Sequence, residues 1–433
     1  MRKYARYKDS GISWIGEVPE HWDVRYLFQK VREHYISNKE VHHQNLLSLS
    51  YGRIIQKDIN KTEGLLPESF DTYQIVENGN IVLRLTDLQN DHKSLRVGLV
   101  TQEGIITSAY ECLEVFDNSL LPVYLYYQLH SFDIKKMFYG MGGGLRQNLN
   151  YNELKKIRMV VPPLSEQKAI AEYLDKKTAQ INELVSAKQK QIELLKEYKQ
   201  SVIANAVTGK LDERTGSRPT DERQEKRKWK DSGISWIGKI PENWDMVRNK
   251  NFVEEKDDVV GGNFQKYPLL SLTKGGVILR DVENGKGKFP KDFESYKIVK
   301  PGNIIFCLFD VDETPRTVGL SNYEGMITGA YDIFQIKNID LNFYTYFFVA
   351  VDNIKALRPL YTGLRKVVKK DRFLSYKIPI PPLSEQKEIV AYIEKKVSSI
   401  DSQIASIENQ IANLNEYKQS LISDVVTGKV KVC

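Results

Sequence analysis

At 433 residues, of which 41% are hydrophobic and 27% charged, the chain is too long for one ordinary core and too apolar to be disordered. We expect two or three domains of about 100 to 200 residues each. The net charge of +7 is a mild excess, which is compatible with a polyanionic partner but does not require one.

The sequence also limits where the protein acts. No run approaches the roughly 20 apolar residues of a membrane span, and the basic start at Met1 lacks the apolar stretch of a signal peptide. The three cysteines, Cys112, Cys307 and Cys433, form no CxxC pair, so neither a disulfide framework nor a zinc site is indicated. We therefore expect a cytoplasmic protein without a metal of its own.

In chain order, the first half begins with KDSGISWIG at residues 8–16 and continues with short β-type runs bounded by glycine, for example 46–50, 79–85 and 105–110. A more helical piece covers 123–137. After Pro162 and Pro163 a long helix is predicted over 165–208, and the charged stretch 212–230 reads as a linker. The second half then repeats this order.

The repetition is close in some blocks. KDSGISWIG returns at 230–238, PPLSEQK at 162–168 returns at 381–387, and EYKQS at 197–201 returns at 416–420. Between these blocks the halves differ in letters but keep a frame, since Gly79-Asn80-Ile81 corresponds to Gly302-Asn303-Ile304. The spacing varies only between 219 and 223 residues. We infer one fold present twice. A duplication without functional meaning is the alternative, but it does not explain why some blocks are kept and others changed.

Each long helix has a heptad pattern of apolar residues, which predicts a coiled-coil seam. At about 1.5 Å per residue each helix would be about 65 Å long, far more than a small core requires. Lys199 and Lys418 occupy equivalent core positions; they either fix the register of pairing or extend their charge to solvent. The residues expected to pair the helices are Leu174, Ile181, Leu195, Val202, Ile393, Ile400, Ile407, Leu414 and Leu421.

The predicted fold class is α+β, with two pseudo-symmetric mixed α/β domains separated by two long helices. The domain boundaries follow the repeats. They are a first globular domain at 1–161, a helix at 162–211, a linker at 212–230, a second globular domain at 231–380 and a final helix at 381–433.

Catalytic patterns are absent from the sequence. There is no G-x-x-x-x-G-K-[ST] loop and no G-x-S-x-G turn, and all six histidines, from His21 to His130, lie in the first half. If a duplicated enzyme used histidine, its second half would be inert. These absences favour a protein without catalytic activity.

Two differing globular domains separated by two nearly identical helices resemble the specificity subunits of type I restriction-modification systems. The residues that carry the resemblance are the openings KDSGISWIGxxPExW at 8 and 230 and the helix starts PPLSEQK at 162 and 381. The resemblance covers essentially the whole chain.

The resemblance implies a function and partners. Each globular domain would be a target recognition domain for one half of a bipartite, asymmetric double-stranded DNA site. The helices would pair antiparallel, set the spacing and dock two modification (methyltransferase) subunits, using the pairing residues named above, and so direct adenine methylation and restriction. The partners would also include restriction (translocase and nuclease) subunits. S-adenosylmethionine, ATP and Mg would bind to the partner subunits, and this chain would bind none of these cofactors.

Candidate DNA-binding residues follow from side-chain chemistry, because Arg can bridge two acceptors on guanine and Asn or Gln can do so on adenine. For each of them phosphate contact or plain exposure to solvent is favoured over base contact, since more than half of protein–DNA hydrogen bonds go to the backbone. The candidates are Arg84, Arg96, Arg146, Gln147, Asn148, Lys274, Arg316, Arg365, Lys366, Lys369 and Lys370.

The repeated tryptophans Trp14, Trp22, Trp236 and Trp244 are interpreted as packing residues.

Three other hypotheses are distinguishable. In a bifunctional system one partner chain would carry both methylation and cleavage, so a partner without a nuclease domain argues against it. A coiled-coil adaptor for proteins alone would have no DNA affinity in the assembled complex. A methyltransferase in its own right would bind S-adenosylmethionine without a partner.

Overall fold

The computed structural model describes residues 3–59, 69–88, 95–141, 148–210, 228–280 and 293–432. It forms two compact units: unit 1 combines residues 1–188 with 408–433, and unit 2 is residues 189–407. Each unit therefore contains one globular domain and part of each long helix. Among the described residues, no helix is both long and apolar enough to cross a membrane.

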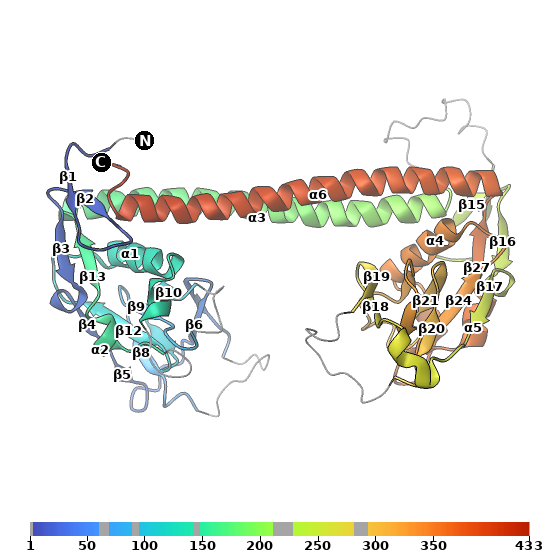
Figure 1. The fold of residues 1–433 in the computed structure, drawn as a ribbon, viewed down its shortest axis with the longest axis horizontal. Helices are drawn as coiled ribbons and strands as arrows, with labels where there is room; N and C mark the ends of the chain where they lie inside the picture. The colour runs from blue at the N-terminus through green and yellow to red at the C-terminus, as the bar shows by residue number, and fades with distance from the viewer. Residues whose placement is uncertain are drawn as a thin grey trace. The chain divides into compact units, whose positions relative to one another are not determined.

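The globular domain of unit 1 consists of small antiparallel sheets packed against helices (Figure 1). A four-stranded sheet has the order β10-β9-β12-β4 and a three-stranded sheet the order β11-β8-β5, with the pairs β1–β2, β13–β3 and β6–β7 beside them. The strands are β1 (Tyr7–Asp9), β2 (Glu17–Pro19), β3 (Asp23–Tyr26), β4 (Val31–Glu33), β5 (Ile36–Ser37), β6 (Leu47–Ser50), β7 (Arg53–Gln56), β8 (Gln74–Val76), β9 (Ile81–Leu83), β10 (Val97–Leu99), β11 (Gly104–Ile106), β12 (Glu111–Val115) and β13 (Arg158–Val161).

The globular domain of unit 2 repeats this arrangement. Its four-stranded sheet has the order β17-β24-β21-β22, which corresponds to β4-β12-β9-β10, and Ile304 pairs with Leu320 as Ile81 pairs with Leu99. The strands are β14 (Trp229–Asp231), β15 (Lys239–Pro241), β16 (Asp245–Arg248), β17 (Val253–Lys256), β18 (Leu270–Thr273), β19 (Gly276–Leu279), β20 (Lys297–Val299), β21 (Asn303–Phe306), β22 (Val318–Leu320), β23 (Gly325–Ile327), β24 (Asp332–Ile336), β25 (Tyr361–Thr362), β26 (Val367–Val368) and β27 (Lys377–Ile380).

The α-helices are α1 (Pro122–Ile134), α2 (Tyr151–Leu154), α3 (Leu164–Val207), α4 (Leu341–Asn353), α5 (Lys370–Ser375) and α6 (Leu383–Val426). Short 3-10 helices lie at Leu27–Gln29 (η1), Met137–Gly140 (η2), Asn249–Asn251 (η4), Gly261–Lys266 (η5) and Arg358–Leu360 (η6).

The sheets are covered on both faces because side chains alternate along each strand. Ile81 and Leu83 of β9 join the core that contains α1, whereas Val82 between them joins a second core with Leu47 and Val76. The continuous apolar runs in the sequence are therefore strands buried on both faces.

The element boundaries agree closely with the pattern-based predictions. The predicted long helix at 165–208 is α3, one residue earlier at each end, and the helical piece at 123–137 is α1 followed by η2. The predicted linker 212–230 falls largely outside the described residues, and its last two residues already belong to β14. The compact units divide both long helices rather than separating them from the globular domains.

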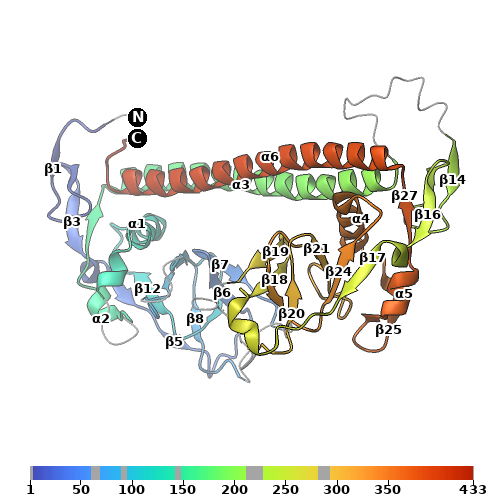
Figure 2. The same cartoon turned by 45° about the vertical axis from the view of Figure 1, so that its right-hand side comes forward.

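The two long helices are paired antiparallel within each unit (Figures 1 and 2). In unit 1, Asn182 and Lys188 of α3 bond to Lys418 and Gln410 of α6, so the two residue numbers run in opposite directions. In unit 2, Ile203 of α3 shares a core with Ile389 and Ile393 of α6. The predicted pairing residues are buried at Leu174, Ile181, Val202, Ile393, Ile400, Ile407 and Leu421, and half-buried at Leu195 and Leu414.

A helix from each domain packs on the paired helices. In unit 2, α4 lies beside the paired helices (Figure 2). Its residues Phe343 and Phe347 belong to the core that also contains Ile203 and Ile393. Asp340 caps α4, because its Oδ1 accepts the backbone N–H groups of Asn342 and Phe343. α1 has the same place in unit 1.

The near-identical sequence blocks meet where each domain joins the helices. Trp22 and Trp244 are fully buried, and their Nε1 atoms donate to Glu166 and Glu385, both at 3.0 Å. This confirms the interpretation of these two tryptophans as packing residues.

The C-terminal stop of each long helix lies against the opening block of a domain. Gly428 has φ +75°, and a Cβ there would lie 2.3 Å from Cδ of Pro19. Gly209 is placed in the same way against Pro241 in unit 2. Only glycine fits both the left-handed backbone and this close approach.

Candidate nucleic-acid interface

The tip of one hairpin differs between the two domains, although the two strands that it joins pair in the same register. β6 and β7 are joined by Tyr51 and Gly52, both with positive φ, as a two-residue hairpin turn requires. Tyr51 is 83% exposed. In unit 2 the equivalent tip between β18 and β19 presents the exposed Lys274. An aromatic ring in one domain and a cation in the other occupy the same framework position, as surfaces for different targets would.

Two loops of unit 2 bring several predicted cations together. The 307–317 loop and the β25–β26 turn are joined where Asp310 N–H donates to the carbonyl of Arg365 at 2.9 Å. Arg365 is 74% exposed, and its Nη2 lies 3.1 Å from Oδ2 of Asp310, with the guanidinium over the ring of Phe309. The guanidinium is thus oriented but still open to solvent.

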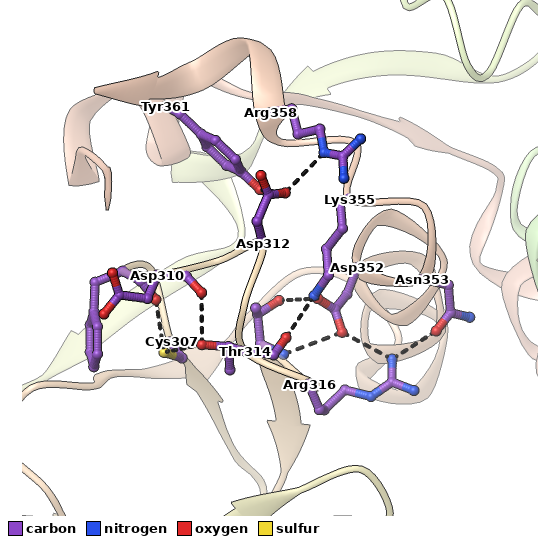
Figure 3. Close-up of polar contacts among 12 residues, drawn as sticks. Cys307, Asp310, Asp312, Thr314, Arg316, Asp352, Asn353, Lys355, Arg358 and Tyr361 are labelled. Atoms are coloured by element: carbon purple, nitrogen blue, oxygen red, sulfur yellow. Dashed lines mark hydrogen bonds and ion pairs between the residues drawn. The ribbon is translucent and has the colours of Figure 1, made fainter. Parts of the chain in front are cut away.

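Lys366, beside it, faces Asp312 at 3.5 Å and Glu313 at 3.6 Å. Asp312 also accepts a hydrogen bond from Arg358 at 2.9 Å, which, more than Lys366, lowers the pKa of this carboxyl (Figure 3). Ion pairs this open to solvent contribute little to stability, because water screens the charges and ordering two side chains costs entropy. A phosphate group could therefore replace these carboxylates at little cost.

Arg316 is less exposed than Arg365 and has a structural role. Its Nη1 lies 3.1 Å from Asp352 Oδ2 and 2.9 Å from Asn353 Oδ1, so it ties the loop to the end of α4 (Figure 3). Asp352 is buried and also accepts from Lys355 at 2.8 Å. With both donors of its Nη1 engaged, Arg316 positions the loop that carries the exposed cations.

The prediction that Arg96 contacts DNA is wrong. The Arg96 side chain is fully buried, and its Nη1 donates to the carbonyl oxygens of Arg84 and Thr86. Its backbone N–H donates to Asp133, as that of Thr317 donates to Asp352 in unit 2. Sequence spacing placed Arg96 at a strand end, but it could not show that carbonyl groups close around the guanidinium.

Other candidates have varied surroundings. Arg84 is half-buried, and Asn148 accepts the backbone N–H of Asp87 with its Oδ1 at 3.0 Å. Lys369 is exposed before α5, whereas Lys370 is paired with Glu255 and, at 3.2 Å, with Asp332. The hydrogen bond with Glu255 is the main cause that raises the Lys370 pKa. The candidates Arg146 and Gln147 lie outside the described residues.

The structure shows one cluster of ionisable residues that sequence reasoning missed. In unit 1, Arg53 follows the hairpin tip and, with Lys418 and His130, lines a cleft between the recognition domain and the paired helices. The sequence offered one signal, since Lys418 is a polar residue at a heptad core position.

Comparison with known proteins identifies the family of the chain. The family described as type I restriction modification DNA specificity domain matches residues 52–194 and 241–416. The chain is 24% identical to a putative type I restriction enzyme MjaX specificity subunit of Methanocaldococcus jannaschii, over 96% of both chains. It is 25% identical to the type I restriction enzyme EcoDI specificity subunit of Escherichia coli, over 75% of this chain and 73% of that one.

A solved structure supports the same fold. A chain determined in work on complex assembly and conformational transition of the type I R-M system has a TM-score of 0.66 and 13% identity, covering 95% of this chain and 99% of that one. The repeated frame, the paired helices and the matched family regions agree. This chain belongs to the specificity subunits of type I restriction-modification systems, the non-catalytic components that recognise DNA.

Proposed function

We propose that each globular domain recognises one half of a bipartite, asymmetric DNA site, and that α3 and α6 set the distance between the halves. The observation that carries this proposal is the hairpin tip, where two hairpins of the same register present Tyr51 in one domain and Lys274 in the other. Two identical tips would suit a symmetric target, whereas two different tips suit two different half-sites.

The helices supply the surface for a partner that binds twice. Leu164 and Tyr198 of α3 are exposed, and so are Leu383 and Tyr417 at the equivalent positions of α6. Unit 1 contains Leu164 and Tyr417, and unit 2 contains Leu383 and Tyr198. By contrast, Leu184 and Leu194 are exposed on α3 alone, since α6 has Gln403 and Asn413 there. A large apolar side chain exposed twice at equivalent positions is expected of a repeated docking surface.

In the proposed complex two modification subunits dock on these helices, methylate adenine using S-adenosylmethionine, and are joined by restriction subunits that use ATP and Mg. The complex would act on DNA in the cytoplasm. The two described cysteines, Cys112 and Cys307, are buried free thiols, which suits a reducing compartment.

Methylation-sensitive sequencing of DNA from cells carrying the complex tests the function directly. We expect one methylated motif with two specified parts separated by unspecified bases. A single continuous motif, or no methylation that depends on this chain, would contradict the proposal.

A docking experiment tests the helices separately. Tyr198→Arg and Tyr417→Arg should each reduce the bound modification subunits from two to one, as measured by native mass spectrometry. Leu194→Arg is the matched control, because Leu194 is exposed on the same helix but is not repeated. Retention of both subunits in the two tyrosine variants would show that this surface does not dock them.

A further inference from the structure

Unit 1 contains a cleft of about 580 Å³ between its recognition domain and its paired helices. The walls come from the β6–β7 turn, from β10, from α1, and from the faces of α3 and α6 toward that domain. The lining is mixed: Tyr126 and Tyr127 provide aromatic surface, and Arg53, Asp175 and Lys418 provide charge.

Among the residues that the structure describes, the cations of this cleft have no carboxylate partner. Lys418 is half-buried, and its Nζ donates to the amide oxygen of Asn182 at 2.9 Å. Neither Lys418 nor Arg53 forms an ion pair with any residue in the described part of the chain. Burial, and secondarily the charge of Arg53, lowers the pKa of Lys418. A partly desolvated ammonium ion next to a guanidinium group is costly unless an anion joins them.

The groups that face Lys418 from the other elements do not neutralise it. The only carboxylate among the described lining residues belongs to Asp175, whose Oδ1 accepts the Tyr127 hydroxyl at 2.6 Å. His130 of α1 is 6% exposed, and no residue in the described ranges forms a hydrogen bond with its Nδ1. Burial, with the charge of Lys418, lowers the pKa of His130 to about 4, so the ring is neutral at physiological pH. One carboxylate therefore faces two cations.

In unit 2, the lysine at the position equivalent to Lys418 has a carboxylate partner within the chain. Lys199 is equivalent to Lys418, and its Nζ bonds both oxygens of Asp401, at 2.7 and 2.8 Å. Asp401 is the equivalent of Asn182, 219 residues later. The hairpin of unit 2 also has Gly276 where that of unit 1 has Arg53. Unit 1 has thus gained one cation and lost one anion relative to its own repeat.

We infer that the cleft of unit 1 binds a phosphate group, held by Arg53 and Lys418, and that its occupant in the complex is a phosphate of the DNA backbone. The Arg53 guanidinium can present two parallel N–H donors to one phosphate, and the Lys418 ammonium can add a third contact. The cleft adjoins the tip formed by Tyr51 and Gly52, which belongs to the proposed DNA surface. The DNA source rests on the proposed function; the phosphate site itself does not.

The repeat provides a matched pair of variants. Asn182→Asp installs the counterion that unit 2 already has, and Asp401→Asn removes it from unit 2. The first arm uses the full chain alone and measures thermal unfolding in inorganic phosphate against chloride at matched ionic strength. We expect phosphate to stabilise the wild type and Asp401→Asn, but not Asn182→Asp. Lys418→Gln, which lacks the charge without adding a carboxylate, should also lose the effect if the altered stability of Asn182→Asp obscures it.

The second arm uses the chain assembled with modification subunits and measures the salt dependence of DNA binding. Asn182→Asp should reduce the slope by about one counterion, and Asp401→Asn should not. If phosphate stabilises the chain selectively but the slope is unchanged, the occupant is a free phosphate and the DNA source is refuted. Equal phosphate stabilisation of wild type, Asn182→Asp and Lys418→Gln would overturn the site. A complex without DNA affinity would refute the proposed function, while the first arm would still decide the site.

Discussion

Lys418 of α6 donates a hydrogen bond from Nζ to Oδ1 of Asn182 on α3, at 2.9 Å. The same contact recurs in unit 2 with the helices exchanged, because Lys199 of α3 bonds Asp401 of α6. A polar residue at a core position can fix the register of a helix pair when its partner occupies one position only. Both lysines find their partner on the opposite helix, as the register hypothesis requires.

Ile407→Asp tests the seam. Ile407 is 6% exposed, so an aspartate there is buried without a counterion and should cost several kcal/mol of unfolding free energy. Chemical denaturation would measure the loss. Leu194→Asp, at an exposed position of α3, is the control and should change stability little. Equal stability of the two variants would show that Ile407 does not lie in a buried seam.

Gly428→Ala should be far more destabilising than Gly16→Ala. Both glycines have φ above +70°, so alanine costs about 1 to 2 kcal/mol at either position. At Gly428 the new Cβ would also lie 2.3 Å from Pro19, whereas nothing lies within 4 Å at Gly16. Urea denaturation should therefore show a clearly larger loss of unfolding free energy for Gly428→Ala. Equal losses would mean that the end of α6 can move away from Pro19 at little cost.

Unit 1 should lose stability in acid, because protonation of Glu166 removes a stabilising carboxylate charge. Burial raises its pKa, but hydrogen bonds from His21, Trp22 and Tyr4 outweigh burial and hold the pKa below its ordinary value. A depressed carboxylate pKa contributes stability above the unfolded value of about 4.3, and this contribution is lost as the pH falls through the folded pKa.

In Glu166→Gln the charge is absent at every pH. The unfolding free energy of the wild type should therefore exceed that of the variant at pH 7, and the gap should narrow below about pH 4.3. A gap that stayed constant with pH would indicate that the carboxylate charge makes no contribution.

Arg365→Ala should weaken DNA binding evenly across sequences and reduce the salt slope by about one counterion. Arg365 corresponds in sequence to Arg146, since each follows Gly-Leu in its half of the repeat. An arginine kept in two halves with different targets suits phosphate, which both targets share. Arg6→Ala, which removes an exposed charge from unit 1, is the control for net charge. In competition with single-base variants of the site, a loss of ~1 to 3 kcal/mol at one base alone would assign Arg365 to base recognition instead.

Exchange of the first domain, from about Trp22 to Met159, with that of a relative should change one half-site only. The structure favours these junctions because β3, which follows Trp22, pairs antiparallel with β13, where Met159 lies opposite Arg25, so both cuts fall at or next to one two-stranded ribbon. Methylation mapping of the hybrid would reveal the new motif. A change in the second half-site would refute independent recognition.

Periodicity predicted the helices and most strands because burial imposes spacing on a sequence. The heptad positions from Leu174 to Leu421 describe one face of each helix, and that face is the one in contact. Side-chain partners were beyond this reasoning. Arg96 and Arg365 are both arginines near loops, yet one is enclosed by carbonyl groups and the other is exposed. That difference depends on how distant segments pack, which neither spacing nor composition encodes.

The counterion difference between Asn182 and Asp401 was visible in the sequence, since it is one letter in a repeat. The sequence did not show what this difference means, because the lysine that contacts each residue lies more than 200 residues away on the other long helix. Comparison of the two halves becomes informative only when the antiparallel contact is known.

Unit 1 is assembled from both ends of the chain. Tyr124 donates to the carbonyl of Val426, and Tyr7 to that of Gly428, while Leu421 and Val425 lie in the same core as Trp22. A ribosome makes the chain from its N-terminus, so the core of unit 1 is complete only after residues 408–432 have been added to a first domain made much earlier. A truncation before residue 408 would therefore damage the fold of the first domain as well as shorten α6.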